Sequence, residues 1–195
     1  MAYWILSLGW IMFYSSHTLL AALNIKRKIH AIMGKGYIWY RLIYSLFSTL
    51  FILALFLYAG TIEPYWLLSP SDWMTYFGFM LATFGTIISV KSMKHLSFFR
   101  FLGLKPYNDL DQKEPLTFKG IFQYIRHPLY AGLILMFLGY FFYIPTLSSL
   151  IHLLALLAYL PFGIYYEEKK LIEIYGEEYL EYRSKVPPLI PRFIK

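Results

Sequence analysis

Two pairs of charged residues stand at the ends of one long apolar stretch. Arg126 and His127 come directly before Pro128, and no Asp, Glu, Lys or Arg occurs in residues 127–166. Proline suits the first turn of a helix, where its missing N–H costs nothing, so the pair is predicted to lie at a helix N-terminus. Free backbone N–H groups and the helix dipole favour an anion there, and the Arg126 guanidinium adds donors suited to a carboxylate or phosphate.

The second pair, Glu167 and Glu168, follows the apolar stretch and is surrounded by basic residues. If the stretch folds as a helical hairpin that turns at residues 144–146, both pairs lie on the same side and His127 comes close to Glu167. An anion-binding group beside a cation-binding group suits a zwitterion, such as an amino-acid group. Each pair alone has a plainer interpretation, as a basic interfacial anchor or as a solvated helix start. Their position at the two feet of one hairpin favours a functional site.

The elements that must position these residues are membrane helices. The chain has 195 residues, of which 58% are hydrophobic and 15% charged, whereas soluble domains have about 45–50% apolar and about 25% charged residues. Soluble, disordered and fibrous classes are therefore excluded. About 20 apolar residues cross a bilayer. We expect an all-α polytopic membrane bundle with about five transmembrane helices, at residues 2–25, 40–61, 72–94, 128–143 and 147–166.

The basic residues indicate the orientation of this bundle. The 18 Lys and Arg outnumber the 11 Asp and Glu. All 18 basic residues lie in residues 26–41, 91–126 and 169–195. By the positive-inside rule, the N-terminus and Glu63 are expected outside and Lys195 in the cytoplasm. This topology explains the positive charge, so we expect membrane lipids as partners and no nucleic acid.

We expect a single domain, with a three-span part at residues 1–95 and a second part at residues 96–195. The second part would comprise a cofactor-binding loop, the hairpin and a C-terminal cap. In the cap, apolar and tyrosine residues recur at helical spacing, which predicts a cytoplasmic amphipathic helix that is interrupted at Gly176. Prolines predict an extended segment at residues 186–191. This cap is interpreted either as an interfacial helix or as a lid over a cofactor, and the two are compatible.

At this point the sequence resembles a known superfamily. Residues 120–132 (GIFQYIRHPLYAG) resemble the G-x-Y-x-x-x-R-H-P-x-Y-x-G stretch of the isoprenylcysteine carboxyl methyltransferase and phospholipid methyltransferase superfamily. Residues 167–187 (EEKKLIEIYGEEYLEYRSKVP) resemble its second signature, E-E-x-x-L-x-x-x-F-G-x-x-Y-x-x-Y. More weakly, residues 16–21 and 40–44 resemble NnrU-like membrane proteins and methanethiol methyltransferases. The order and spacing of the two main motifs make this resemblance specific.

The resemblance implies S-adenosylmethionine as methyl donor, bound on the cytosolic side. The cofactor-binding residues that it implies are Glu114, Pro115, Leu116, Thr117, Phe122, His127, Pro128, Leu129, Tyr130, Glu167 and Glu168. The catalytic candidates are Arg126, His127 and Glu167. Phe122 stands where the family usually has Tyr. Gly163 stands where prenylcysteine enzymes have a substrate-binding Arg, which argues against a prenylcysteine carboxylate as acceptor.

The reaction implied is an in-line displacement of the methyl group, for which the protein aligns the acceptor and excludes water. Aromatic faces, with Tyr130, Tyr165 and Tyr166 as candidates, stabilise a sulfonium. The acceptor is expected to be lipophilic or small. A thiol or carboxylate needs little base, whereas an amine requires Glu167 or His127 to accept a proton.

The competing hypothesis is a non-enzymatic, NnrU-like protein that binds haem, a metal or a small molecule, or that assists assembly of a redox enzyme. The candidate ligands are His17, His95, His127 and His152. No two histidines lie three or four residues apart, and the absence of cysteine removes thiolate sites, so no metal site is expected. The sequence leaves the oligomeric state open.

Overall fold

The computed structural model describes residues 1–94, 98–111 and 115–191, with the backbone alone at Phe98 and Phe101. Over these ranges the chain is helical and has no strand, which confirms the all-α class; the one bridge pairs Trp66 with Thr146. The elements in order are α1 (Ala2–Ala21), α2 (Leu23–Met33), η1 (Gly34–Trp39), α3 (Tyr40–Thr61), α4 (Asp72–Lys94), α5 (Phe98–Phe101), η2 (Gly120–Gln123), α6 (Pro128–Tyr143), α7 (Leu147–Tyr175) and α8 (Glu177–Lys185).

Three helical stretches are long and apolar enough to cross a membrane, at Leu23–Thr61, Asp72–Lys94 and Leu147–Tyr175. The helix Pro128–Tyr143 is apolar but shorter. The protein is therefore an integral membrane protein by the length and composition of its helices. The helices at 40–61, 72–94 and 128–143 have the predicted bounds. An uncharged run forms the centre of each, and the first two helices also include charged residues near their ends, such as Arg41 and Lys91.

Two predicted helix ends are wrong. The helix expected at residues 2–25 ends at Ala21, because Ala22 is extended with φ −69° and ψ 136°; the basic residues that follow belong to the separate helix α2. The helix expected to end at residue 166 continues to Tyr175, since Glu and Lys are good helix formers. It ends where Gly176 takes a positive φ of 59°, a conformation that glycine adopts without strain.

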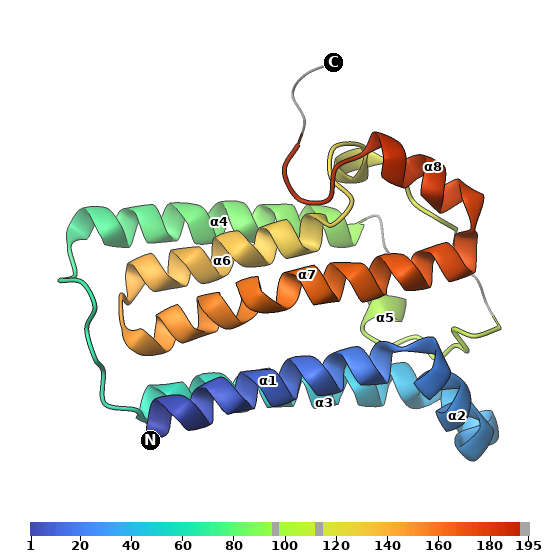
Figure 1. Ribbon diagram of the computed structural model, residues 1–195, viewed down its shortest axis with the longest axis horizontal. Coiled ribbons are helices and arrows are strands. Elements are labelled where there is room, and N and C mark those ends of the chain that lie inside the picture. Colours follow the sequence, from blue (N-terminus) through green and yellow to red (C-terminus); the bar gives the residue numbers. More distant parts are fainter. Residues whose placement is uncertain (95–97, 112–114, 192–195) are drawn as a thin grey trace.

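The long helices lie side by side (Figure 1), and glycines set the spacing of α4 and α6. A Cβ atom on Gly132 would lie 2.2 Å from Ser89 Oγ, and one on Gly78 would lie 2.7 Å from the Gly139 carbonyl oxygen. Small residues allow this close approach between membrane helices. On the other side, α1 packs on α3 and α7 around a core of Leu6, Trp10, Phe13, Leu55 and Ala59.

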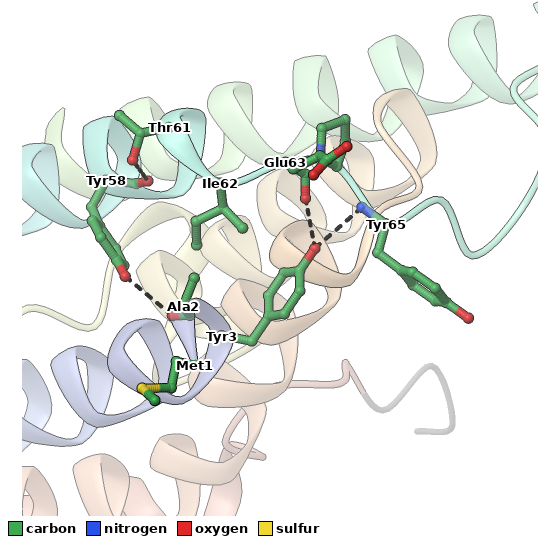
Figure 2. Close-up of a pocket in the computed structure, with 9 residues that line it drawn as sticks. Met1, Ala2, Tyr3, Tyr58, Thr61, Ile62, Glu63 and Tyr65 are labelled. Atoms are coloured by element: carbon green, nitrogen blue, oxygen red, sulfur yellow. Dashed lines mark hydrogen bonds between the residues drawn. The ribbon is translucent and has the colours of Figure 1, made fainter.

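One end of the bundle gathers the N-terminus, the α3–α4 connection and the turn between α6 and α7 (Figure 1). The Leu67 N–H donates to the Pro145 carbonyl at 2.9 Å. Figure 2 shows the Tyr3 hydroxyl donating to the Glu63 carbonyl at 2.9 Å, beside a cavity of about 590 Å³. These connecting segments carry no Lys or Arg. The two motifs lie at the opposite end, near α8.

At this opposite end, the segment that follows α5 is tied to α2 by a buried ion pair. Lys26 is 3% exposed and pairs with Asp109. The Tyr37 hydroxyl also donates to Asp109, over 2.8 Å. Because a buried charge without its partner is costly, this pair fixes the loop before the first motif against the N-terminal helices.

Candidate active site at the feet of the α6–α7 hairpin

The hairpin begins and turns at residues with clear local roles. Pro128 is the first residue of α6, and His127 is its N-cap with φ −120° and ψ 62°. At the turn, Thr146 and Ser149 form a capping box for α7: the Ser149 N–H donates to Thr146 Oγ1, and the Thr146 N–H donates to Ser149 Oγ at 3.1 Å. The two helices are therefore antiparallel neighbours, and residues 167 and 168 lie beside the start of α6.

Glu168 is surrounded by three cationic side chains. Arg126 donates to its Oε1 through Nε at 2.8 Å and through Nη2 at 2.6 Å. His127 Nε2 lies 3.1 Å from the same oxygen, and Arg183 Nε lies 3.0 Å from Oε2. The Glu168 side chain is 6% exposed. Both carboxylate oxygens are thus already used within the protein.

Arg126 also holds the C-terminal segment. Its Nη1 donates to the carbonyls of Arg183, at 3.0 Å, and of Val186. The Arg126 N–H donates to the Pro187 carbonyl at 2.9 Å, and the His127 N–H donates to the Pro188 carbonyl at 3.0 Å. The extended segment predicted from its prolines therefore pairs with the residues that precede α6.

Helix α8 buries two tyrosines against the same foot of the hairpin. Tyr179 is 1% exposed and Tyr182 is 8% exposed. The Tyr182 hydroxyl donates to the Phe122 carbonyl at 2.7 Å, and its ring lies 4.8 Å from that of Phe118. Tyr179 and Arg183 share a face of α8, because residues four apart are neighbours on a helix. This spacing is the signal that would have identified Arg183, which the sequence analysis missed.

Glu167 differs from its neighbour. Its side chain is 45% exposed, and its Oε2 lies 3.4 Å from His127 Nδ1. It also interacts with the Tyr130 hydroxyl. The Tyr130 ring lies 5.6 Å from the His127 ring at an interplanar angle of 25°. The hairpin thus brings Arg126, His127, Tyr130, Glu167 and Glu168 together, and Glu167 is the carboxylate that remains open to a ligand.

His127 is the cation between the two carboxylates. Burial lowers the pKa of His127, but hydrogen bonds and charges from Glu167 and Glu168 outweigh burial and raise it to about 9. The imidazole is therefore protonated near neutral pH. A protonated imidazole has no lone pair for another proton, so the structure argues against His127 as the base that the sequence left possible for an amine acceptor.

The residues of this site fit the methyl donor that the resemblance implies. An open carboxylate, Glu167, suits an ammonium or sulfonium group. The Tyr179 hydroxyl is buried and has no hydrogen-bond partner within the described part of the chain, although it lies within electrostatic range of Arg126, Glu167 and Glu168. A buried polar atom without a partner requires an explanation, and a polar ligand at this foot would provide one.

The other residues predicted to bind the cofactor lie in the first turn of α6 and in the segment around η2. Pro128 is buried and Leu129 is partly buried in the first turn of α6. Pro115, Leu116 and Thr117 lie in an irregular segment before η2, which contains Phe122. Glu114 lies outside the described residues, as does His95. Tyr165 and Tyr166 are 60% and 51% exposed, so Tyr130 is the aromatic candidate that contacts the site.

The other described histidines are bound to neighbouring side chains. His152 is fully buried and accepts a hydrogen bond from Trp10 Nε1 at 2.7 Å on its Nδ1. His17 lies in α1 and bonds to hydroxyl groups of α3. Within residues 1–94, 98–111 and 115–191, no three His, Asp or Glu side chains are grouped so as to hold a metal ion.

Comparisons with known proteins agree with the two motifs. A family profile described as phospholipid methyltransferase matches residues 73–178, which is more than half of the chain. No solved structure matches significantly.

Three relatives illustrate the similarity. The methanethiol S-methyltransferase of Crocosphaera subtropica is 37% identical over 118 residues, covering 58% of this chain and 46% of that protein. Methanethiol S-methyltransferase 1 of Bradyrhizobium diazoefficiens is 32% identical over 112 residues, covering 55% of this chain and 39% of that protein. The protein-S-isoprenylcysteine O-methyltransferase of Schizosaccharomyces pombe is 38% identical over 80 residues, covering 39% and 34%.

The chain spans less than half the length of each of these relatives. The profile match includes the α4–α6 pair, the hairpin and both glutamates of the site. The chain therefore belongs to the phospholipid methyltransferase family.

Proposed function

We propose that the protein is an integral membrane methyltransferase that uses S-adenosylmethionine at the foot of the α6–α7 hairpin. The observation that supports this most is the unequal pair of glutamates. Glu168 is sequestered by Arg126, His127 and Arg183, whereas Glu167 is half exposed beside the His127 imidazolium. This arrangement leaves one carboxylate available for a cationic ligand and uses the other to fix the site.

Each residue has a proposed role toward the donor. Glu167 binds a positively charged group, and the face of Tyr130 stabilises a sulfonium. The first turn of α6 presents backbone N–H groups that suit a carboxylate. Pro115, Leu116, Thr117 and Phe122 contribute largely through their backbone. When bound, the donor supplies an already activated methyl group, so the protein's own part is alignment and exclusion of water.

Arg126 has a positioning role in this proposal. Its donors bind Glu168 and the carbonyls of Arg183 and Val186, so it holds α8 and the extended segment over the hairpin foot. The interpretation of the C-terminal cap as a lid is supported by these contacts. An amphipathic α8 at the membrane interface is compatible with the same position.

The acceptor is proposed to be small. A Cβ atom on Gly163 would lie 2.8 Å from the Tyr159 ring, so this ring covers the position where prenylcysteine enzymes have a substrate-binding arginine. Tyr159 is held there by a stack on Tyr14, with ring centroids 4.1 Å apart, and by Thr18 Oγ1 at 3.1 Å from its hydroxyl. Two of the relatives above are named for methanethiol, a small acceptor.

We also propose five spans, with α1 and α6 crossing beside the three longer stretches, and a cytoplasmic active site. The segregation of Lys and Arg to the end that holds α2 and α8 supports this orientation.

The test is transfer of a labelled methyl group from S-adenosylmethionine by purified protein in vesicles. Methanethiol and an organic extract of host membranes would serve as separate acceptors, with Glu167→Gln as the comparison. We expect product with wild type and a large loss in the variant. Folded wild-type protein that labels neither acceptor pool would contradict the proposal.

A further inference from the structure

The proposed reaction leaves one proton without a destination. Methylation of a neutral S–H, N–H or O–H group releases that proton, and a base at the site would accept it. His127 is already protonated between Glu167 and Glu168. Glu168 is taken up by three cations, and the proposed function assigns Glu167 to the positive charge of the donor. The acceptor side of the site therefore needs another group.

His17 lies in α1, outside the α6–α7 hairpin, and its polar partners lie in α3. Its ring nitrogens lie 2.9 Å from the Tyr44 hydroxyl, and its Nδ1 lies 3.2 Å from Ser48 Oγ. These partners are hydroxyl groups from α3, which donate to or accept from either tautomer. The nearby rings of Phe13 and Tyr44 have centroids 5.5 and 5.1 Å from the imidazole. In contrast to His127, this histidine has no carboxylate among these contacts.

Tyrosines connect His17 to the hairpin foot. Tyr130 lies within electrostatic range of Tyr44, Tyr159 and Glu167. Next to His17 on α1, Thr18 Oγ1 lies 3.1 Å from the Tyr159 hydroxyl of α7. Helix α1 packs against both α3 and α7. The helices thus gather His17, Tyr44, Tyr130 and Tyr159 on the membrane side of Glu167, where an acceptor that enters between spans would meet a donor held from the cytosol.

We propose that His17, held by Tyr44 and Ser48, binds the methyl acceptor and takes its proton, and that the acceptor is a small thiol. This inference rests on the proposed function. The S–H bond breaks and its proton passes to an imidazole nitrogen. The thiolate sulfur then bonds to the methyl carbon as the carbon–sulfonium bond breaks, and that electron pair stays on the donor sulfur. The products are a methyl thioether and the neutral thioether form of the donor.

The need for a base favours a thiol over an amine. The thiolate, not the thiol, is the nucleophile, so a thiol that is protonated near neutral pH must lose its proton before or during attack, and an imidazole in contact with it accepts that proton. A neutral amine attacks with its own lone pair and loses its proton only afterwards. A carboxylic acid is ionised at neutral pH and needs no base.

The experiment compares His17→Gln with His30→Gln, the same change at a partly buried histidine of α2. Binding of S-adenosylhomocysteine and thermal unfolding show first that each variant is folded and holds the donor product. We expect both variants to match wild type in these measurements. Wild type that does not bind S-adenosylhomocysteine overturns the proposed function itself.

Methyl transfer to ethanethiol is then measured between pH 6 and 9. We expect His17→Gln to lower kcat/KM about 100-fold or more at pH 7, in the range of general base catalysis. The loss should shrink as pH rises, because the thiol then ionises in water. His30→Gln should behave as wild type.

Two results overturn the inference without affecting the proposed function. One is a His17→Gln variant with the rate and pH profile of wild type. The other is wild type that methylates a phospholipid amine and not ethanethiol.

Discussion

Replacing Glu168 by glutamine should destabilise the protein far more than the same change at Glu167. The Glu168 carboxylate neutralises Arg126 and His127, whose side chains are 9% and 3% exposed. Glutamine leaves both cations buried beside an uncharged amide, and removal of one partner from a buried ion pair costs about 3–5 kcal/mol. Glu167 is 45% exposed and lies farther from His127, at 3.4 Å, so its loss resembles that of a surface pair, about 0–1 kcal/mol.

These free energies predict separable thermal shifts. For a chain of this size, 1 kcal/mol corresponds to roughly 2–4 °C in Tm. Glu168→Gln should lower Tm by roughly 6–20 °C, and Glu167→Gln by no more than about 4 °C. The assay is fluorescence-detected unfolding of purified protein in mild detergent at pH 7. Glu181→Gln is the control, because Glu181 is exposed and pairs with Lys185 on the surface of α8.

A second readout reports the C-terminal segment. Arg126 links Glu168 to the carbonyls of Arg183 and Val186, so Glu168→Gln should speed tryptic cleavage near Arg183 and Lys185. Equal Tm shifts for the two glutamate variants, or an unchanged cleavage rate in Glu168→Gln, would refute the assignment of Glu168 as the structural member of the pair.

Three further predictions concern the site, the helix packing and the topology. Because the pKa of His127 is raised from about 6.5 to about 9, its stabilising charge is fully present below about pH 6.5 and is lost as pH rises through 9; Tm should fall between about pH 6.5 and 9, and His127→Gln should remove that fall. Gly132→Ala should cost about 1–3 kcal/mol by separating α4 from α6, measured as a lower Tm, whereas Gly60→Ala, which has nothing within 4 Å of the new Cβ, should not destabilise; equal effects would contradict the packing. A cysteine at position 63 should react with an impermeant reagent on intact cells and one at 185 only after permeabilisation, and the reverse pattern would overturn the orientation.

Most of the long helices, and the close approach of the two motifs, could be predicted from the sequence. Uncharged runs, extended over the charged residues at their ends, predicted three of the helices with their observed bounds. The turn at residues 144–146 implied that both feet lie together. The same signal failed at Ala21 and at residue 166. An apolar run indicates which part of the chain lies in the membrane, but it does not indicate where the helix ends. Helix α7 continues through its charged residues until Gly176.

The division of roles within the site was not predictable from the motifs. Glu167 and Glu168 are adjacent, but successive residues on a helix point about 100° apart, so only one of them faces Arg126 and α8. Which one does so depends on how α8 folds back after Gly176. The contact between His17 and Tyr44 depends in the same way on the packing of α1 against α3.

The central claim is that the hairpin foot is a donor-binding site in which Glu167 is the open carboxylate, and calorimetric titration with S-adenosylhomocysteine tests it most directly. The account predicts that folded wild-type protein binds, and that His127→Ala and Glu167→Ala each weaken binding more than tenfold, as expected from the loss of one charge-assisted contact worth about 1.5–3 kcal/mol. Absence of binding by folded wild type, or undiminished binding by the Glu167→Ala variant, would contradict it.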